Sequence, residues 1–236
     1  MCSVGAAREN ARTVRDTMPR ITFEIVNDLY LYARSELGAG SRARRQDALT
    51  GVTQRVQQLE GFLSANMVHD DKWSCLRSGS DVERADMMTR IVDVRSVDLL
   101  PNLELAPFQD IQWRSVLRSL YAMQGYQTAV QEPIDREPVL EFLFTSPTLP
   151  RAYRRCLEHI RGCLRTLPRN AAPLRTCNRM LRQLRQYDFS VLEGAALHES
   201  VDQRQIDLAT LHAEIIRTYF QFRPRVARQK RSSRRA

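Results

Sequence analysis

Apolar residues recur at intervals of three and four along most of this 236-residue sequence, and this spacing constrains the fold more than any other feature. Residues three and four apart share one face of an α-helix, so the spacing predicts amphipathic helices. No segment alternates apolar and polar residues for long enough to predict a strand. We therefore expect an all-α protein, a multi-helix bundle of about eight or nine helices with no sheet.

The predicted helices are separated by short segments rich in proline and glycine. The clearest one, residues 153–167, places Tyr153, Cys156, Leu157, Ile160, Leu164 and Leu167 on one face. Asp70 or Asp71 is expected to cap a long helix over about residues 70–99, and Asp135 a short one. The other helices are expected in the ranges 3–17, 20–37, 49–63, 113–120, 174–184 and 190–220. Residues 101–107 form a connector, but both sides of it are alike in composition, so we expect one helical domain over residues 1–222.

The net charge of +9 belongs mostly to the end of the chain. Residues 223–236 hold seven basic residues and no acid, which leaves +2 for residues 1–222. Such a tail is typical of a disordered, solvated terminus, and also of segments that contact nucleic acids or anionic surfaces. Because no aromatic residue lies among its basic residues for stacking on bases, we do not expect a nucleic-acid partner.

Other familiar signals of function are missing from the sequence. Its five cysteines are odd in number and form no C-x-x-C pair, which argues against a disulfide framework or a four-thiolate zinc site. It has no apolar run of membrane-spanning length, no signal peptide, no glycine-rich phosphate loop and no His/Cys cluster with metal-ligand spacing. We expect a cytoplasmic protein with reduced thiols, without a membrane partner, cofactor or metal, and name no catalytic residue.

Charged residues gather in the segment 81–93 in an unusual way. On a helical projection Trp73, Leu76, Met87, Ile91 and Val94 form an apolar arc, and Arg84 lies in the middle of it. A guanidinium in an apolar stripe is costly unless it is paired. We expect its partner to be a carboxylate of a neighbouring helix, with Glu9 or Asp16 favoured. The resulting candidate charge cluster consists of Glu9, Arg12, Asp16, Glu83, Arg84 and Asp86.

This cluster has three possible interpretations. It could be a structural network of ion pairs between helices, an anion or substrate site, or a set of side chains that extend to solvent from a helix edge. A second basic stripe, formed by Arg151, Arg154, Arg161 and Arg165 with Glu158 among them, is expected to be a solvated helix face.

Several segments resemble signatures of the bacterial alpha-E family, an all-helical domain of unknown function named for an ER motif. They are residues 7–16 (ARENARTVRD), 83–86 (ERAD) and 149–158 (LPRAYRRCLE), together with a connector over 125–135 and the ending 218–220. The resemblance extends over about residues 3–221. Family members usually begin with a further helical segment, which we expect this chain to lack. Its loss would expose an apolar stripe, either Ala7–Ala11–Val14–Met18 or Ile25–Leu29–Ala33.

The resemblance implies a setting but no reaction. Such proteins are commonly encoded beside, or fused to, circularly permuted ATP-grasp proteins and transglutaminase-like peptidases. We therefore expect a non-catalytic helical partner of an ATP-grasp or transglutaminase-like protein, in a system that makes or modifies peptides. The alternatives are an enzyme or ligand-binding protein that uses the Glu/Arg/Asp cluster and, less favoured, a nucleic-acid binder that uses the basic tail.

Overall fold

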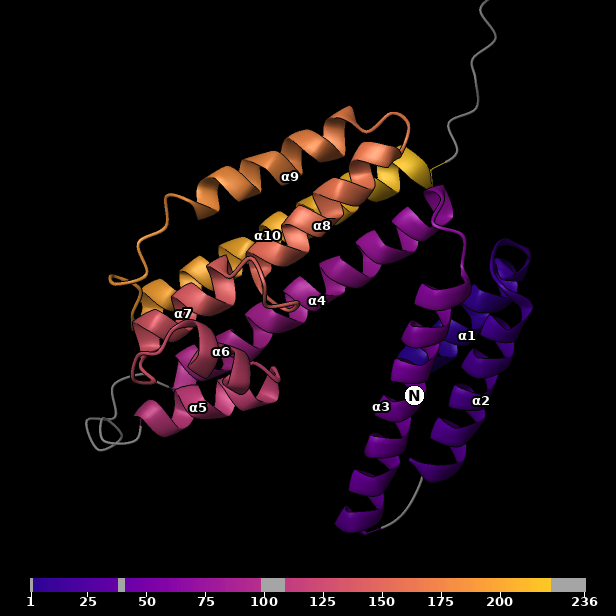
Figure 1. Cartoon of the computed structure of the whole chain (residues 1–236), viewed down its shortest axis with the longest axis horizontal. Coiled ribbons are helices and arrows are strands. Elements are labelled where there is room, and N and C mark those ends of the chain that lie inside the picture. The colour runs from indigo at the N-terminus through magenta and orange to yellow at the C-terminus, as the bar shows by residue number, and fades with distance from the viewer. Residues whose placement is uncertain (1, 38–40, 99–108, 222–236) are drawn as a thin grey trace, which may run out of the picture. The chain divides into compact units, whose positions relative to one another are not determined.

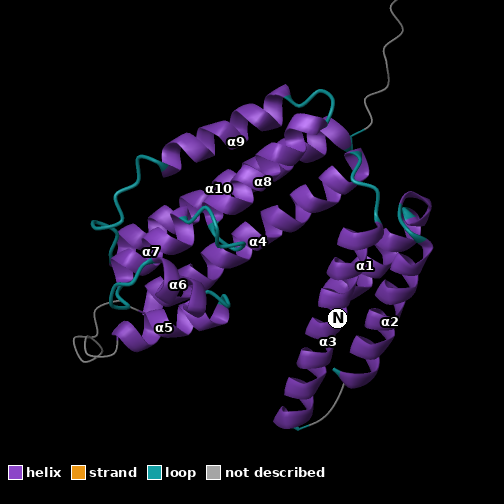
Figure 2. Ribbon diagram, viewed as in Figure 1, coloured by secondary structure: helices purple, strands orange, loops and turns teal. Residues whose placement is uncertain are grey.

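The computed structural model describes residues 2–37, 41–98 and 109–221, and every regular element in these ranges is helical (Figure 2). The helices are α1 (Cys2–Thr13), α2 (Arg20–Glu36), α3 (Arg42–Asn66), α4 (Asp71–Asp98), α5 (Gln109–Ser119), α6 (Met123–Ala129), α7 (Arg136–Thr145), α8 (Tyr153–Thr166), α9 (Ala171–Leu184) and α10 (Gly194–Tyr219), with a 3₁₀ turn, η1 (Arg15–Thr17), after α1. The prediction of an all-α fold without a sheet is confirmed for these residues. The basic tail and the connector 101–107 lie outside them.

The described residues form ten α-helices, whereas eight or nine were predicted. The additional helix is α6, which has only seven residues and lies at the start of the segment predicted as a connector. Tyr121, with a positive φ of 54°, separates it from α5. The Tyr126 ring is buried, and its hydroxyl donates to the Pro133 carbonyl oxygen at 2.9 Å. Tertiary burial thus holds a helix that is too short for apolar periodicity to reveal.

Aspartate side chains begin two helices as predicted. Asp135 accepts a hydrogen bond from the backbone N–H of Arg136 at the start of α7. Asp70 accepts from the backbone N–H groups of Lys72 and Trp73 at the start of α4, at 2.9 and 3.2 Å. Both carboxylates satisfy N–H groups that have no partner within their helix.

The chain divides into two compact units, Met1–Trp73 and Ser74–Ala236, which are described separately. The boundary falls in the first turn of α4, so no linker composition marks it in the sequence. In the first unit α2 packs against both α1 and α3.

The burial of residues in the first unit shows whether either of the two predicted apolar stripes is exposed. Ile25, Leu29 and Ala33 of α2 are buried, so theirs is not the exposed one of the two predicted stripes. In the other stripe, Ala11 is buried and Val14 is exposed. The stripe of α2 is covered because α2 lies between two helices of its own unit.

The second unit contains the large hydrophobic core. Figure 1 shows α8, α9 and α10 as long helices lying side by side, with α4 alongside. The buried face of α8 consists of the residues that its sequence pattern predicted, Tyr153, Cys156, Leu157, Ile160 and Leu164. No helix in the described residues is long and apolar enough to cross a membrane.

The buried face of α4 is not the predicted one. Leu76, Met87 and Val94 of the predicted apolar arc are exposed. The buried residues follow a different stripe, Ser74, Ser78, Asp81, Ala85, Met88 and Val92. The prediction failed because four of these six side chains are small or polar, whereas the projection was oriented by the bulky apolar residues. The spacing of four, three, four, three and four residues nevertheless marks a packing face.

Candidate functional site

Asp81 of α4 is a buried carboxylate with two partners. Its side chain is 2% exposed. Oδ1 accepts a hydrogen bond from the Arg84 guanidinium at 2.7 Å, and Oδ2 lies 3.0 Å from Nδ1 of His159. A carboxylate in the interior of a protein persists only when it is paired in this way. Asp81 therefore fixes a guanidinium of its own helix and an imidazole of α8.

These three residues lie on a small cavity at the start of α8. The cavity has a volume of about 130 Å³, and it is lined by Arg77, Asp81, Arg84, Thr148, Pro150, Arg155 and His159. The turn before α8 is held by the Ser146 hydroxyl oxygen, which accepts from the backbone N–H of Leu149 at 3.1 Å. Two of the segments that resemble the alpha-E signatures, 83–86 and 149–158, thus contribute to one cavity. We call it the Asp81 pocket.

The Asp81 pocket carries an excess of positive charge. Three arginines line it, and Asp81 is the one carboxylate in the lining. The Arg84 side chain is 18% exposed, so its charge is partly removed from water. Guanidinium groups suit carboxylates and phosphates because their N–H groups match two oxygens at once. The arrangement is therefore chemically suited to bind an oxyanion.

The predicted charge cluster is distributed over local pairs. Arg84 is paired with Asp81, three residues before it on the same helix. Glu9 and Asp16, the partners that the sequence favoured, belong to the first unit, so their pairing with Arg84 stays a prediction. Glu83 is exposed. Asp86 accepts a hydrogen bond from Arg90 at 2.6 Å, one turn along α4.

The remaining members of the cluster belong to the first unit. Arg12 and Glu9 form an exposed pair on α1, and the hydrogen bond from Arg12 lowers the pKa of Glu9. Asp16 lies 3.7 Å from its neighbour Arg15 and is almost fully exposed. Glu9, Asp16 and Asp86 each lie within ion-pair distance of an arginine one to four residues away, and no ion pair is seen for Glu83 in the described residues.

The buried cysteines are poor candidates for nucleophiles. Burial raises the pKa of both Cys156 and Cys177 to about 12, and burial also raises that of Cys163. At neutral pH these groups remain thiols, and the thiolate is the nucleophilic form. Among the described cysteines, Cys75 and these three form no disulfide.

A second histidine is held by carboxylates from two helices. His198 of α10 has Nδ1 at 2.6 Å from Asp93 of α4 and Nε2 at 3.9 Å from Asp202. Asp93, His198 and Asp202 each offer one ligand atom, and these three atoms lie within 4.8 Å of one another, which is close enough for them to share a cation. The sequence gives no sign of this group because Asp93 and His198 are 105 residues apart.

We expect His198 to make stability depend on pH. The hydrogen bond to Asp93 raises the pKa of His198 above its ordinary value of 6.5, and the charges of Asp93, Asp202 and Glu199 act in the same direction. A raised pKa in the folded state stabilises the fold below the unfolded pKa, and this contribution is lost as the pH rises through the folded pKa. His198→Gln should therefore destabilise the protein at about pH 5.5 and much less at about pH 8.5.

The measurement is urea unfolding followed by circular dichroism at both pH values. His212→Gln is the matched control, because His212 is exposed on the same helix. An equal loss of stability at both pH values in His198→Gln would contradict the prediction.

The comparisons with known proteins agree with this architecture. The chain matches the model of the Alpha-E family over residues 1–220, and the family is described as a predicted alpha-helical domain with a conserved ER motif. The sequence contains one Glu-Arg dipeptide, Glu83–Arg84, and its arginine lines the Asp81 pocket. No curated protein and no solved structure matches the chain. Because the family match covers nearly the whole sequence, this chain belongs to the Alpha-E family.

Proposed function

We propose that this protein is a non-catalytic accessory protein of an ATP-grasp or transglutaminase-like system that makes or modifies peptides, and that the Asp81 pocket binds an oxyanion in that system. The observation that carries the binding proposal is the convergence of Arg77, Arg84 and Arg155 on a cavity whose one carboxylate is Asp81. The family resemblance supports the setting.

The chemistry of peptides supplies suitable ligands for the pocket. Forming a peptide bond consumes a carboxylate, commonly after it has been activated with a phosphoryl group, and cleaving a peptide bond releases a carboxylate. Either oxyanion presents two or more oxygens to paired N–H donors. The cavity of about 130 Å³ is smaller than the roughly 300–1,000 Å³ of most ligand pockets, so it suits an anionic end group more than a whole substrate.

Oxyanion binding is tested by titrating the full chain with inorganic phosphate and, separately, with acetate, followed by isothermal titration calorimetry. We expect at least one of these probes to bind, and Arg155→Gln to weaken its binding by about tenfold, since a charge-assisted hydrogen bond contributes about 1.5–3 kcal/mol. Arg155 is exposed and has no ion pair in the described residues, so its replacement should leave the fold intact.

Arg165→Gln is the matched control, because Arg165 is exposed on the same helix and does not line the pocket. Phosphate and acetate distinguish a phosphoryl ligand from a carboxylate ligand. Equal affinity in the wild-type protein and in Arg155→Gln, or no binding of either probe, would contradict the proposal.

The accessory role is tested through its partners. Affinity capture of the tagged chain from its native host, followed by mass spectrometry, should recover an ATP-grasp or transglutaminase-like protein. A wild-type capture that reproducibly lacks both would contradict this part of the proposal.

One observation favours an enzyme as the second candidate. A carboxylate oxygen accepts hydrogen bonds, so when the imidazole of His159 is neutral its contact with Oδ2 of Asp81 favours the tautomer with the proton on Nδ1. Nε2 is then the basic nitrogen, and a carboxylate that orients a histidine in this way is a common arrangement for general-base catalysis. This candidate predicts turnover of a peptide or ester by the purified chain that is lost in His159→Gln. Oxyanion binding without turnover supports the accessory role.

A further inference from the structure

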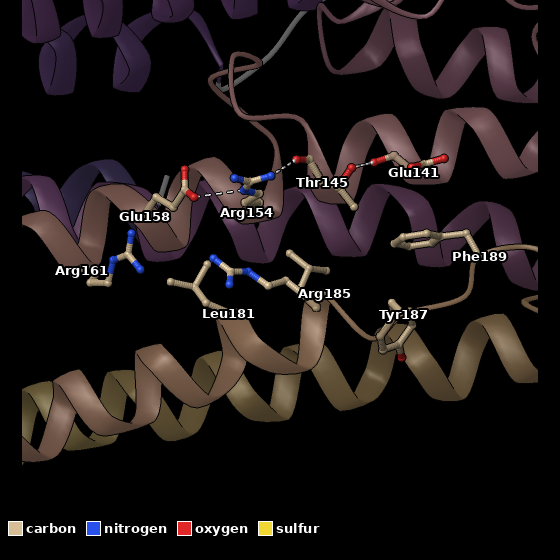
Figure 3. Close-up of a pocket in the computed structure, with 10 residues that line it drawn as sticks. Glu141, Thr145, Arg154, Glu158, Arg161, Leu181, Arg185, Tyr187 and Phe189 are labelled. Atoms are coloured by element: carbon tan, nitrogen blue, oxygen red, sulfur yellow. Dashed lines mark hydrogen bonds and ion pairs between the residues drawn. The ribbon is translucent and has the colours of Figure 1, made fainter.

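A second cavity lies on another face of α8, between α8 and α9 (Figure 3). Its volume is about 220 Å³, and α7 and the segment after α9 complete its walls. Arg154, Glu158 and Arg161 of α8 line it at spacings of four and three residues, which places them on one face of the helix. Arg155 and His159, which line the Asp81 pocket, follow Arg154 and Glu158 by one position and so lie on a different face. We call this second cavity the α8–α9 cavity.

One end of the α8–α9 cavity is rich in guanidinium groups. Figure 3 shows the side chains of Arg154, Arg161 and Arg185 gathered at the Glu158 end. Arg154 is satisfied, because its Nε donates to Glu158 at 3.0 Å. In the described part of the chain, the guanidinium groups of Arg161 and Arg185 have neither a hydrogen bond nor an ion pair, whereas the backbone N–H of Arg185 donates to the Arg182 carbonyl oxygen. Two guanidinium groups, one from α8 and one from the residue that follows α9, are therefore available for an anion. The sequence pattern predicted that Arg154 and Arg161 are solvated.

The other end of the cavity is apolar and rigid. Tyr187 and Phe189 have ring centroids 5.6 Å apart, and Phe189 also contacts Phe144 in the core. The Tyr187 hydroxyl is hydrogen-bonded to Ser200, and the Arg204 guanidinium lies 4.9 Å from the centre of its ring. These contacts fix the Tyr187 ring before a ligand arrives, which reduces the entropy lost on binding.

We infer that the α8–α9 cavity binds a carboxylate attached to an apolar or aromatic group, as found at the C-terminus of a peptide that ends in an apolar residue. The carboxylate lies between Arg161 and Arg185, and the side chain lies toward Tyr187 and Phe189. Glu141 is exposed at the Phe189 end, and the lining retains three arginines against two glutamates, so an anion is favoured. The volume suits one residue more than a long peptide segment. This site uses other side chains than the Asp81 pocket and does not depend on the function proposed for that pocket.

The test is calorimetric titration of the full chain with N-acetyl-phenylalanine. Two comparison ligands each remove one half of the recognition: N-acetyl-phenylalanine amide lacks the charge, and acetate lacks the aromatic ring. We expect the complete ligand to bind at least about tenfold more tightly than either one, since the charge and the apolar surface each contribute more than about 1.4 kcal/mol.

Substitutions of the lining arginines show whether N-acetyl-phenylalanine binds in the α8–α9 cavity. Arg161→Gln and Arg185→Gln should each weaken the binding of N-acetyl-phenylalanine by about tenfold and leave the melting temperature unchanged, because neither breaks an ion pair. Arg165→Gln and Arg182→Gln are the matched controls, because these arginines are exposed on the same two helices and do not line the cavity. Both controls should bind as the wild type does.

Three outcomes would overturn the inference. The first is that the amide binds as tightly as the acid. The second is that acetate binds in this cavity, shown by a weakening of its binding in Arg185→Gln, as tightly as N-acetyl-phenylalanine does. The third is that Arg155→Gln removes the binding while Arg161→Gln and Arg185→Gln do not, since the ligand would then occupy the Asp81 pocket. The binding of phosphate or acetate at the Asp81 pocket should be unaffected by Arg185→Gln, so the two sites can fail independently.

Discussion

Replacing Asp81 by alanine is expected to lower the free energy of unfolding by about 3–5 kcal/mol, as is typical when one partner of a buried ion pair is removed. The carboxylate is buried, and it is the hydrogen-bond partner of Arg84 at 2.7 Å and of His159 at 3.0 Å. Without it, the largely buried guanidinium of Arg84 loses the carboxylate at 2.7 Å.

The size of this effect should depend on the charge left behind. In Asp81→Leu/Arg84→Met both charges are replaced by apolar side chains of similar volume, so we expect this double variant to be more stable than Asp81→Ala. Asp86→Ala is the matched control, because Asp86 also pairs with an arginine on α4 but its partner Arg90 is more than half exposed. A surface pair of this kind contributes at most about 1 kcal/mol.

Urea unfolding monitored by circular dichroism measures all three variants. If Asp81→Ala lowers the free energy of unfolding no more than Asp86→Ala does, the contacts of Asp81 with Arg84 and His159 do not stabilise the fold as predicted. Oxyanion binding should also be lost in a folded Asp81→Ala variant, because the Arg84 and His159 side chains would no longer be fixed.

Replacing Trp113 by alanine is expected to cost about 3–5 kcal/mol, because it removes the largest side chain type from a site that cannot refill the space. Trp113 of α5 is 1% exposed and belongs to the core to which all the helices from α4 to α10 contribute. Its indole Nε1 is buried and has no hydrogen-bond partner among the described residues. Trp113→Phe should therefore cost much less than Trp113→Ala, since it loses volume but no hydrogen bond.

Ile111→Ala is the matched control on the same helix, where the Ile111 side chain is 56% exposed. Its effect should stay within about 0.5 kcal/mol. The midpoint of urea unfolding, compared at an unchanged denaturant slope, measures each change. A Trp113→Phe variant as unstable as Trp113→Ala would show that the indole nitrogen makes an essential contact.

The helices of this protein could be predicted from its sequence because amphipathic periodicity is local information. The buried face of α8 is the clearest case. Its apolar residues recur every three or four positions with charged residues between them, so no other face of the helix could be buried. The Asp70 and Asp135 caps are local as well, because each involves a side chain and backbone groups at most three residues away. The absence of strands in the described residues follows from the same pattern.

The tertiary structure alone decided where charges that are distant in the sequence meet. Asp81 and His159 are 78 residues apart, and Asp93 and His198 are 105 apart, so no sequence spacing could relate them. The projection of α4 favoured its bulky apolar residues, whereas close packing selected a face of small side chains that includes a buried aspartate. The α8–α9 cavity likewise exists because two basic helices lie side by side. A sequence determines which faces of its helices are apolar, but the position of each charge depends on which helices become neighbours, and packing between distant segments decides that.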